Sequence, residues 1–155
     1  MSKYDDASWH YGGNYPQDLP KEKASTHIGM FLTWCIDNNL ISEDHIQDSI
    51  EDIESVRNRT ITGADFLINN CDEKITDSDL NKIGNKFAKD YYSLSKKTKF
   101  STKFADYLDD YAKILNNSST EIDLYMVENS WSNYDLLKPL IGQRFEEWKE
   151  FTTTK

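Results

Sequence analysis

The chain has 155 residues, of which 37% are hydrophobic and 13% aromatic, and this composition is typical of one domain with a core and excludes disorder throughout. The formal net charge of −9 disfavours nucleic acid and anionic membranes as partners, because both bind cationic surfaces, whereas it suits solubility and a basic protein partner. The two cysteines predict no disulfide framework. The N-terminal region is not apolar, and no apolar run is longer than Ile28–Trp34, so we expect neither a signal peptide nor a membrane span. These features together predict a cytoplasmic protein.

The first 23 residues are predicted to form an ordered arm. Gly12-Gly13 and the prolines Pro16 and Pro20 interrupt any helix in this segment. Aromatic side chains such as Trp9 and Tyr15 make the segment too apolar for a loose tail. We therefore expect the arm to pack along the rest of the domain.

Apolar spacing predicts the next helices. The first, from about Ser25 to Asn38, is apolar on nearly all sides and is expected at the centre of the domain. The second, from Ser42 to Arg57, is amphipathic. Its expected inward stripe is Ile46, Ile50, Ile53 and Val56. A short helix is expected from Gly63 to Asn70.

Capping residues and proline mark the remaining helices. Thr76 and Asp79 have the spacing of a capping box and predict a helix that continues to about Ser95. A further helix is expected from about Thr102 to Leu115. Pro139 is expected to begin the last full helix, where its missing N–H costs little.

Residues 122–127 are the one segment where a strand competes with a helix, because β-prone residues alternate with a polar one. A lone strand needs a partner, and the N-terminal arm is the only other aromatic segment outside the predicted helices. The expected fold is thus mainly α: a single compact helical domain of about five to seven helices, with a short two-stranded β element as an open alternative. The domain spans residues 1–155, with the arm at 1–23, a helical body at 24–151 and a frayed tail at 152–155.

Four residues near the N-terminus carry the groups that acid–base catalysis or metal binding requires: Asp5, Asp6, His10 and His27. They could converge only through folding of the arm. No two histidines have i, i+4 spacing, no HExxH pattern occurs, and the glycines form no phosphate-binding loop. We therefore expect structural hydrogen-bonding roles for these residues, no catalytic residue, no cofactor and no metal, and a protein that is not an enzyme.

One predicted surface is strongly acidic. We call it the acidic face, and its residues are Glu43, Asp44, Asp48, Glu51, Asp52 and Glu54. Such a surface can steer and dock a basic protein partner through charge complementarity. The alternative is an ordinary solvated helix surface, and the two remain open at this point.

Long stretches of the sequence resemble an uncharacterised bacterial domain family of unknown function. The opening carries the pattern DASWHxGGx[FY]PxDLP, followed by THIGMF, and Cys71–Asn81 match CDxKxTDxDLN. Leu124–Val127, Trp131 and Arg144–Trp148 match further motifs towards the C-terminus. The resemblance marks a set of signature residues without giving them a role: Asp6, Ser8, Trp9, His10, Gly12, Gly13 and His27.

The resemblance implies no activity, because the family has none assigned. In size and acidity the chain is similar to the immunity proteins of bacterial toxin systems, which are small cytosolic proteins that neutralise a toxin domain by binding it. We favour a small protein-binding module, with an immunity protein against an interbacterial toxin as the finer hypothesis. Two alternatives stay open: a small hydrolase or metal-binding enzyme built on the four N-terminal residues named above, and a homo-oligomeric structural domain.

Overall fold

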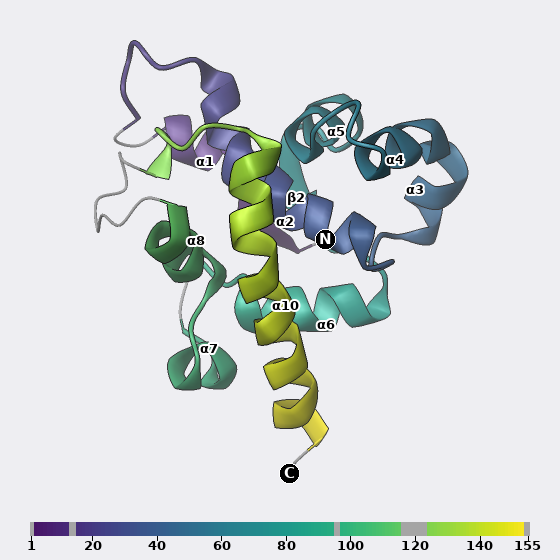
Figure 1. Cartoon of the computed structure of the whole chain (residues 1–155), viewed down its shortest axis with the longest axis vertical. Coiled ribbons are helices and arrows are strands. Elements are labelled where there is room, and N and C mark those ends of the chain that lie inside the picture. The colour runs from purple at the N-terminus through teal and green to yellow at the C-terminus, as the bar shows by residue number, and fades with distance from the viewer. Residues whose placement is uncertain (1, 13–14, 95–96, 116–123, 154–155) are drawn as a thin grey trace.

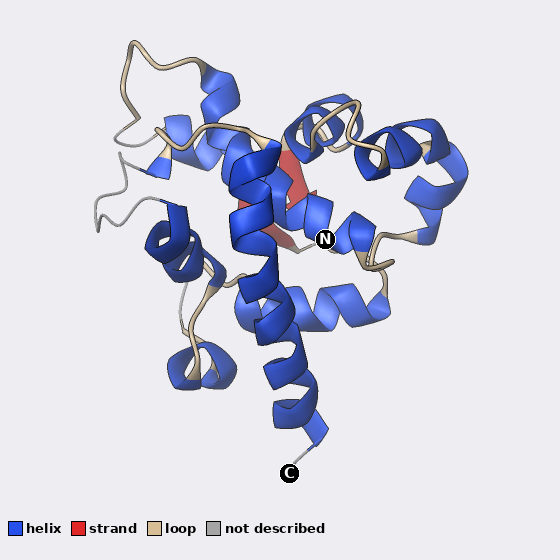
Figure 2. Ribbon diagram, viewed as in Figure 1, coloured by secondary structure: helices blue, strands red, loops and turns tan. Residues whose placement is uncertain are grey.

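The structure is a computed structural model that describes residues 2–12, 15–94, 97–115 and 124–153. It is mainly α-helical with one small two-stranded antiparallel sheet, as predicted (Figure 2). In chain order its elements are β1 (Lys3–Asp6), α1 (Ala7–Tyr11), the 3-10 helix η1 (Lys21–Ser25), α2 (Thr26–Asp37), α3 (Glu43–Asp48), α4 (Ile50–Arg57), α5 (Gly63–Asn70), β2 (Lys74–Thr76), α6 (Lys82–Tyr91), α7 (Lys99–Lys103), α8 (Tyr107–Leu115) and α10 (Trp131–Thr153). None of the described helices is long and apolar enough to cross a membrane.

Helix α2 is the centre of the domain, and its prediction is confirmed. Every residue of α2 except Asp37 is buried, in keeping with a helix that is apolar on nearly all sides. Helix α5 packs directly on α2, because Gly29 and Gly63 let the two backbones meet. A Cβ atom added at Gly29 would lie 2.4 Å from the backbone nitrogen of Ala64, so the contact tolerates no side chain there.

The N-terminal arm is ordered, as expected, and forms part of the core. Strand β1 pairs antiparallel with β2, with Asp5 opposite Ile75. The arm nevertheless contains the short helix α1, which the sequence analysis did not expect. Asp6 explains it, because the Asp6 carboxylate accepts a hydrogen bond from the Ser8 N–H at 2.9 Å and caps the helix.

The strand considered as an alternative for residues 122–127 is absent from the described part of this segment. Leu124 is helical, Tyr125 and Met126 form a turn and Val127 lies in a bend, while residues 122 and 123 lie outside the described residues. Leu124, Tyr125 and Val127 are buried, so these β-prone side chains pack in the hydrophobic core without forming a strand. The two-stranded element itself exists, and the partner of the arm is β2.

The predicted helix from Ser42 to Arg57 is two helices. Ser49 breaks it with φ −132° and ψ 29°, between α3 and α4. Because of this break only Ile53 and Val56 of the expected stripe are buried, whereas Ile46 and Ile50 are 38% and 42% exposed.

The helix predicted from Thr76 to Ser95 begins later, at Lys82. The Asp79 carboxylate accepts from the Thr76 N–H at 2.8 Å, as in a capping box, but this bond closes a turn after β2. The true N-cap is Asn81, whose side chain accepts from the Gly84 N–H at 2.9 Å.

The helix predicted from Thr102 to Leu115 is likewise two helices, α7 and α8. Asp106 follows the break, and its carboxylate accepts a hydrogen bond from the Asp109 N–H at 2.9 Å at the start of α8. Helix α8 is tied to its neighbours by Asp110, which is buried. Asp110 accepts hydrogen bonds from the Arg144 guanidinium of α10 at 2.9 and 3.1 Å and from the Tyr91 hydroxyl of α6 at 2.7 Å.

The last helix, α10, begins eight residues before Pro139, which therefore lies inside it rather than at its start. The Ser130 hydroxyl accepts from the Asn133 N–H at 3.1 Å and caps the helix there. An internal proline costs about 3 kcal/mol or more, and the burial of Leu137 and Ile141 on either side of it offsets this cost. Figure 1 shows α10 running along the molecule in front of α2.

Candidate functional site

The candidate functional site is a buried cluster that we call the His–Asp cluster: Asp5, His10 and His27. The Nε2 atom of His10 lies 2.7 Å from Oδ1 of Asp5, and Nε2 of His27 lies 2.9 Å from Oδ2 of the same carboxylate. The two Nε2 atoms are 3.2 Å apart. Three segments supply the cluster, since Asp5 lies on β1, His10 on α1 and His27 in the first turn of α2.

Further groups hold the cluster from outside. The Tyr92 hydroxyl donates to Oδ2 of Asp5 at 2.5 Å, and the Asp6 N–H donates to Oδ1 at 2.8 Å. On the other side, Nδ1 of His10 lies 2.6 Å from the hydroxyl of Tyr125. The Asp5 carboxylate therefore faces four donor groups, two on each oxygen, which is the full capacity of a carboxylate.

Burial and these contacts set the protonation of the cluster. Asp5, His10 and His27 are 0%, 7% and 1% exposed. Burial by itself raises the pKa of Asp5, but the adjacent His27 and His10 outweigh it and hold that pKa well below its usual range. Burial lowers the pKa of His27, and burial next to the Asp5 charge raises the pKa of Tyr92 well above its usual value. The cluster thus holds an ionised carboxylate beside a neutral His27.

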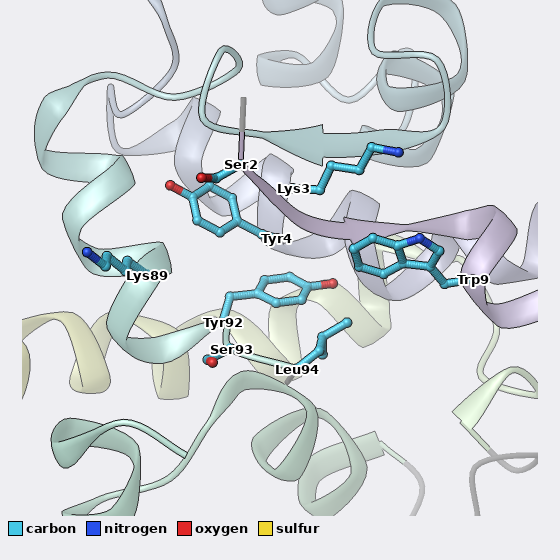
Figure 3. A pocket seen from close by; sticks show the side chains of 8 residues that line it. All are labelled: Ser2, Lys3, Tyr4, Trp9, Lys89, Tyr92, Ser93 and Leu94. Carbon is cyan, nitrogen blue, oxygen red and sulfur yellow. The ribbon is translucent and has the colours of Figure 1, made fainter. Parts of the chain in front are cut away.

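Chemically, two imidazoles and a carboxylate can share protons or bind a metal ion. Tyr92, whose hydroxyl bonds Asp5, also lines a surface pocket of about 400 Å³. Figure 3 shows the rings of Tyr4, Tyr92 and Trp9 around this pocket. One phenol ring therefore separates the Asp5 carboxylate from a solvent-accessible hollow.

The remaining signature residues have other places in the structure. Asp6 does not join the cluster, because its carboxylate caps α1 and pairs with Lys3 at 3.0 Å. Ser8 is exposed and donates its hydroxyl to Asp6, and Trp9 is 50% exposed at the pocket. Gly12 ends α1. Gly13 lies outside the described residues.

A second polar cluster joins α3 to the segment around β2. Nε2 of His45 lies 2.7 Å from Oδ1 of Asp79 and 3.7 Å from the sulfur of Cys71. Burial and the neighbouring Asp79 raise the pKa of the Cys71 thiol, so the thiol stays protonated. Asp79 already closes the turn at Thr76, so this cluster is explained as part of the local structure.

The acidic face lies on α3 and α4. Its residues are exposed except Asp52, which is half-buried and accepts a hydrogen bond from the Asn70 side chain at 2.8 Å. Among the described residues, the structure pairs only one of the six with a cation, Glu54 with Arg57 at 3.2 Å. The exposed side chains of Ile46 and Ile50 lie on the same two helices.

Sequence reasoning missed the tyrosines that complete the His–Asp cluster. Tyr92 directly follows α6, and Tyr125 lies in the segment that was predicted as a strand. Each hydroxyl reaches the cluster across 87 or more residues of sequence, and no spacing rule connects positions so far apart. The polar end of an otherwise buried tyrosine was the only signal, since such a hydroxyl needs a partner.

The fold and this site define a mainly α-helical domain with a polar cluster buried between its N-terminal arm and helix α2. The chain belongs to a domain family of unknown function (DUF7832), which matches residues 3–127 and so includes all three residues of the His–Asp cluster. No curated protein and no solved structure matches the chain.

Proposed function

We propose that this protein is a small cytoplasmic protein-binding module that docks a basic protein surface through its acidic face. The observation that carries the proposal is the exposure of Ile46 and Ile50 among carboxylates that have almost no cationic partners within the described chain. Apolar side chains supply affinity when they are buried in an interface, whereas unpaired charges steer the encounter and select the partner.

The finer proposal is an immunity protein that neutralises an interbacterial toxin domain. Six carboxylates against one arginine over residues 43–57 imitate the charge of a phosphate backbone, which a nuclease toxin would recognise. Stable binding of this kind needs no catalytic group in the binder. The protein would act by covering the toxin's basic surface.

The test is co-expression with the product of the adjacent gene, followed by affinity purification. The doubly reversed variant Asp48→Lys/Glu51→Lys should lose the complex, because each change replaces attraction with repulsion. The control Glu22→Lys/Glu146→Lys makes the same change of charge at exposed sites on η1 and α10, and it should leave the complex intact. The absence of a complex at micromolar concentration, or equal effects of both variants, would contradict the proposal.

Light scattering separates this proposal from the homo-oligomeric alternative. A protein that docks a foreign partner through α3 and α4 should be monomeric when it is pure. A stable dimer that the Asp48→Lys/Glu51→Lys variant breaks would instead assign the acidic face and its isoleucines to self-association.

The enzyme alternative is kept because three of its four residues, Asp5, His10 and His27, converge, whereas the Asp6 carboxylate caps α1 instead. Its obstacle is access, since all three side chains are buried. Turnover would therefore need the side chains that cover the cluster to move. Hydrolysis of chromogenic esters or phosphates by the wild type, abolished by His10→Gln, would favour this alternative over simple binding.

A further inference from the structure

We propose that Asp5, His10 and His27 bind one divalent first-row transition-metal ion, for which Zn²⁺ is the reference. This site is independent of the acidic face and goes beyond the protein-binding proposal. The argument rests on the distances between the three ligand atoms, on the protons they carry, and on the groups that orient them.

The distances approach those of a metal site. A tetrahedral zinc ion with bonds of about 2.0–2.1 Å separates its ligand atoms by about 3.3 Å. The two Nε2 atoms of His10 and His27 are 3.2 Å apart. His10 faces Oδ1 of the Asp5 carboxylate at 2.7 Å and His27 faces Oδ2 at 2.9 Å, so an ion between the three groups requires each of these separations to lengthen by about half an ångström.

The protons give a second argument. Without a metal, the tautomers in which both histidines donate from Nε2 to Asp5 place two N–H donors 3.2 Å from each other. Like N–H dipoles at this distance repel, so the hydrogen bonds of both rings to the shared carboxylate hold them together against this repulsion. A cation between the two nitrogens and the carboxylate replaces this repulsion with attraction, because each nitrogen then offers a lone pair.

The surroundings are those of oriented ligands. A metal-binding histidine usually bonds a further group through its other nitrogen, and this bond fixes the ring. The Tyr125 hydroxyl, 2.6 Å from Nδ1, does so for His10 and turns Nε2 inward. Tyr92 and the Asp6 N–H orient the Asp5 carboxylate in the same way.

A tyrosine ring that contacts the cluster also carries a buried hydroxyl without a partner. The Tyr111 hydroxyl is buried and has no hydrogen-bond partner within the described parts of the chain. Its ring packs edge-on against the His27 imidazole, with 6.0 Å between centroids. Three protein ligands leave a fourth position on a tetrahedral ion for a bound water.

The second cluster, His45 with Cys71 and Asp79, does not support the same conclusion. It contains a single imidazole, so no pair of N–H donors is forced together. Its Asp79 already closes a turn, and its thiol stays protonated. This cluster therefore serves as the internal control.

The ion would act as a structural link. Its three ligands come from β1, α1 and α2, so binding would join the arm to the central helix. Metal binding of this kind is coupled to folding, because the unfolded chain has no preformed site. At a free metal concentration 100-fold above the dissociation constant, the stabilisation would raise the melting temperature by roughly 5–10 °C for a domain of this size.

The experiment uses the full chain. The purified protein is stripped with a chelator and titrated with Co²⁺ and Zn²⁺, while visible absorption and the melting temperature are recorded. We expect one equivalent of Co²⁺ to give the absorption of a tetrahedral site, displacement of that absorption by Zn²⁺, and the rise in melting temperature given above. A stripped wild type that shows neither absorption nor a shift in melting temperature overturns the proposal without any variant.

Variants locate the site. His10→Gln and His27→Gln should each weaken binding by at least about 100-fold, since loss of an outer partner alone costs about 10–100-fold. Tyr125→Phe tests such an outer partner and should weaken binding within that range. His45→Gln should leave affinity unchanged. Binding that survives His10→Gln and disappears in His45→Gln places the metal at the second cluster and overturns the proposal.

Discussion

The substitution Asp5→Asn isolates the buried charge on which the N-terminal arm depends. The Asp5 carboxylate accepts hydrogen bonds from four groups: the Asp6 N–H, His10, His27 and the Tyr92 hydroxyl. An asparagine keeps one of the two acceptor oxygens. Its amide NH₂ replaces the other oxygen and therefore points two N–H donors at groups that donated to that oxygen. Two hydrogen bonds to a charged acceptor are then lost, each contributing about 1.5–3 kcal/mol, so we expect a loss of about 3–6 kcal/mol of unfolding free energy.

Urea denaturation of the chelator-treated protein, followed by tryptophan fluorescence, measures this loss as a shift in the midpoint at unchanged slope. Asp6→Asn is the matched control. It makes the same change one residue later, but an asparagine side chain still caps α1 and only the partly exposed pair with Lys3 is lost. We expect this control to cost less than about 1 kcal/mol. Equal stability of the Asp5→Asn variant and the wild type would refute the view that an ionised Asp5 organises the cluster.

Three further predictions follow from other parts of the structure. Gly29→Ala should lower the free energy of unfolding in urea by about 1–3 kcal/mol or more, because the added Cβ would lie 2.4 Å from the backbone of α5. Gly142→Ala should instead raise it by up to about 1 kcal/mol, because nothing lies nearer than 4.0 Å to the added Cβ in α10. Hydrogen bonds from Arg59 lower the pKa of Asp135 to about 2. The pair therefore stabilises the fold above about pH 4 and loses this effect as the pH falls towards 2. Arg59→Ala should return the pKa of Asp135 towards its usual value, which a carboxyl NMR titration measures. Tyr111→Phe should leave the melting temperature of the metal-free protein unchanged or higher, because it removes a buried hydroxyl without a partner, and a marked decrease would reveal a partner for that group.

Local patterns predicted the parts of the fold whose structure is decided locally. Helices α2 and α5 lie where apolar spacing placed them, within a residue at each end. The capping-box spacing of Thr76 and Asp79 misled because its hydrogen bond forms equally well in a turn that no helix follows directly. The break at Ser49 was invisible because apolar spacing continues through it, and only the packing of α3 and α4 reveals which isoleucines face outward.

The candidate site depended on information that the sequence holds only indirectly. Its residue types were identified, and so was the condition that the arm must fold back. What brings Asp5 to His27 is the antiparallel register of β1 with β2, which pairs Asp5 with Ile75. That register is set by contacts 70 residues apart, beyond the reach of periodicity or capping. Asp6 illustrates the limit, since it adjoins Asp5 in sequence yet serves α1 instead.

The arm also makes folding depend on contacts between distant parts of the chain. Tyr4 bonds Asn85, Asp5 bonds Tyr92, and His10 contacts Tyr125, across 81, 87 and 115 residues. During synthesis the charged Asp5 leaves the ribosome long before any of these partners exists, and closing such distant contacts is slow because the entropy of a long loop must be lost first. The nascent chain therefore carries a charged Asp5 that has no hydrogen-bond partners yet and whose burial would cost free energy. The full set of contacts around the arm can form only after Tyr125 has been synthesised.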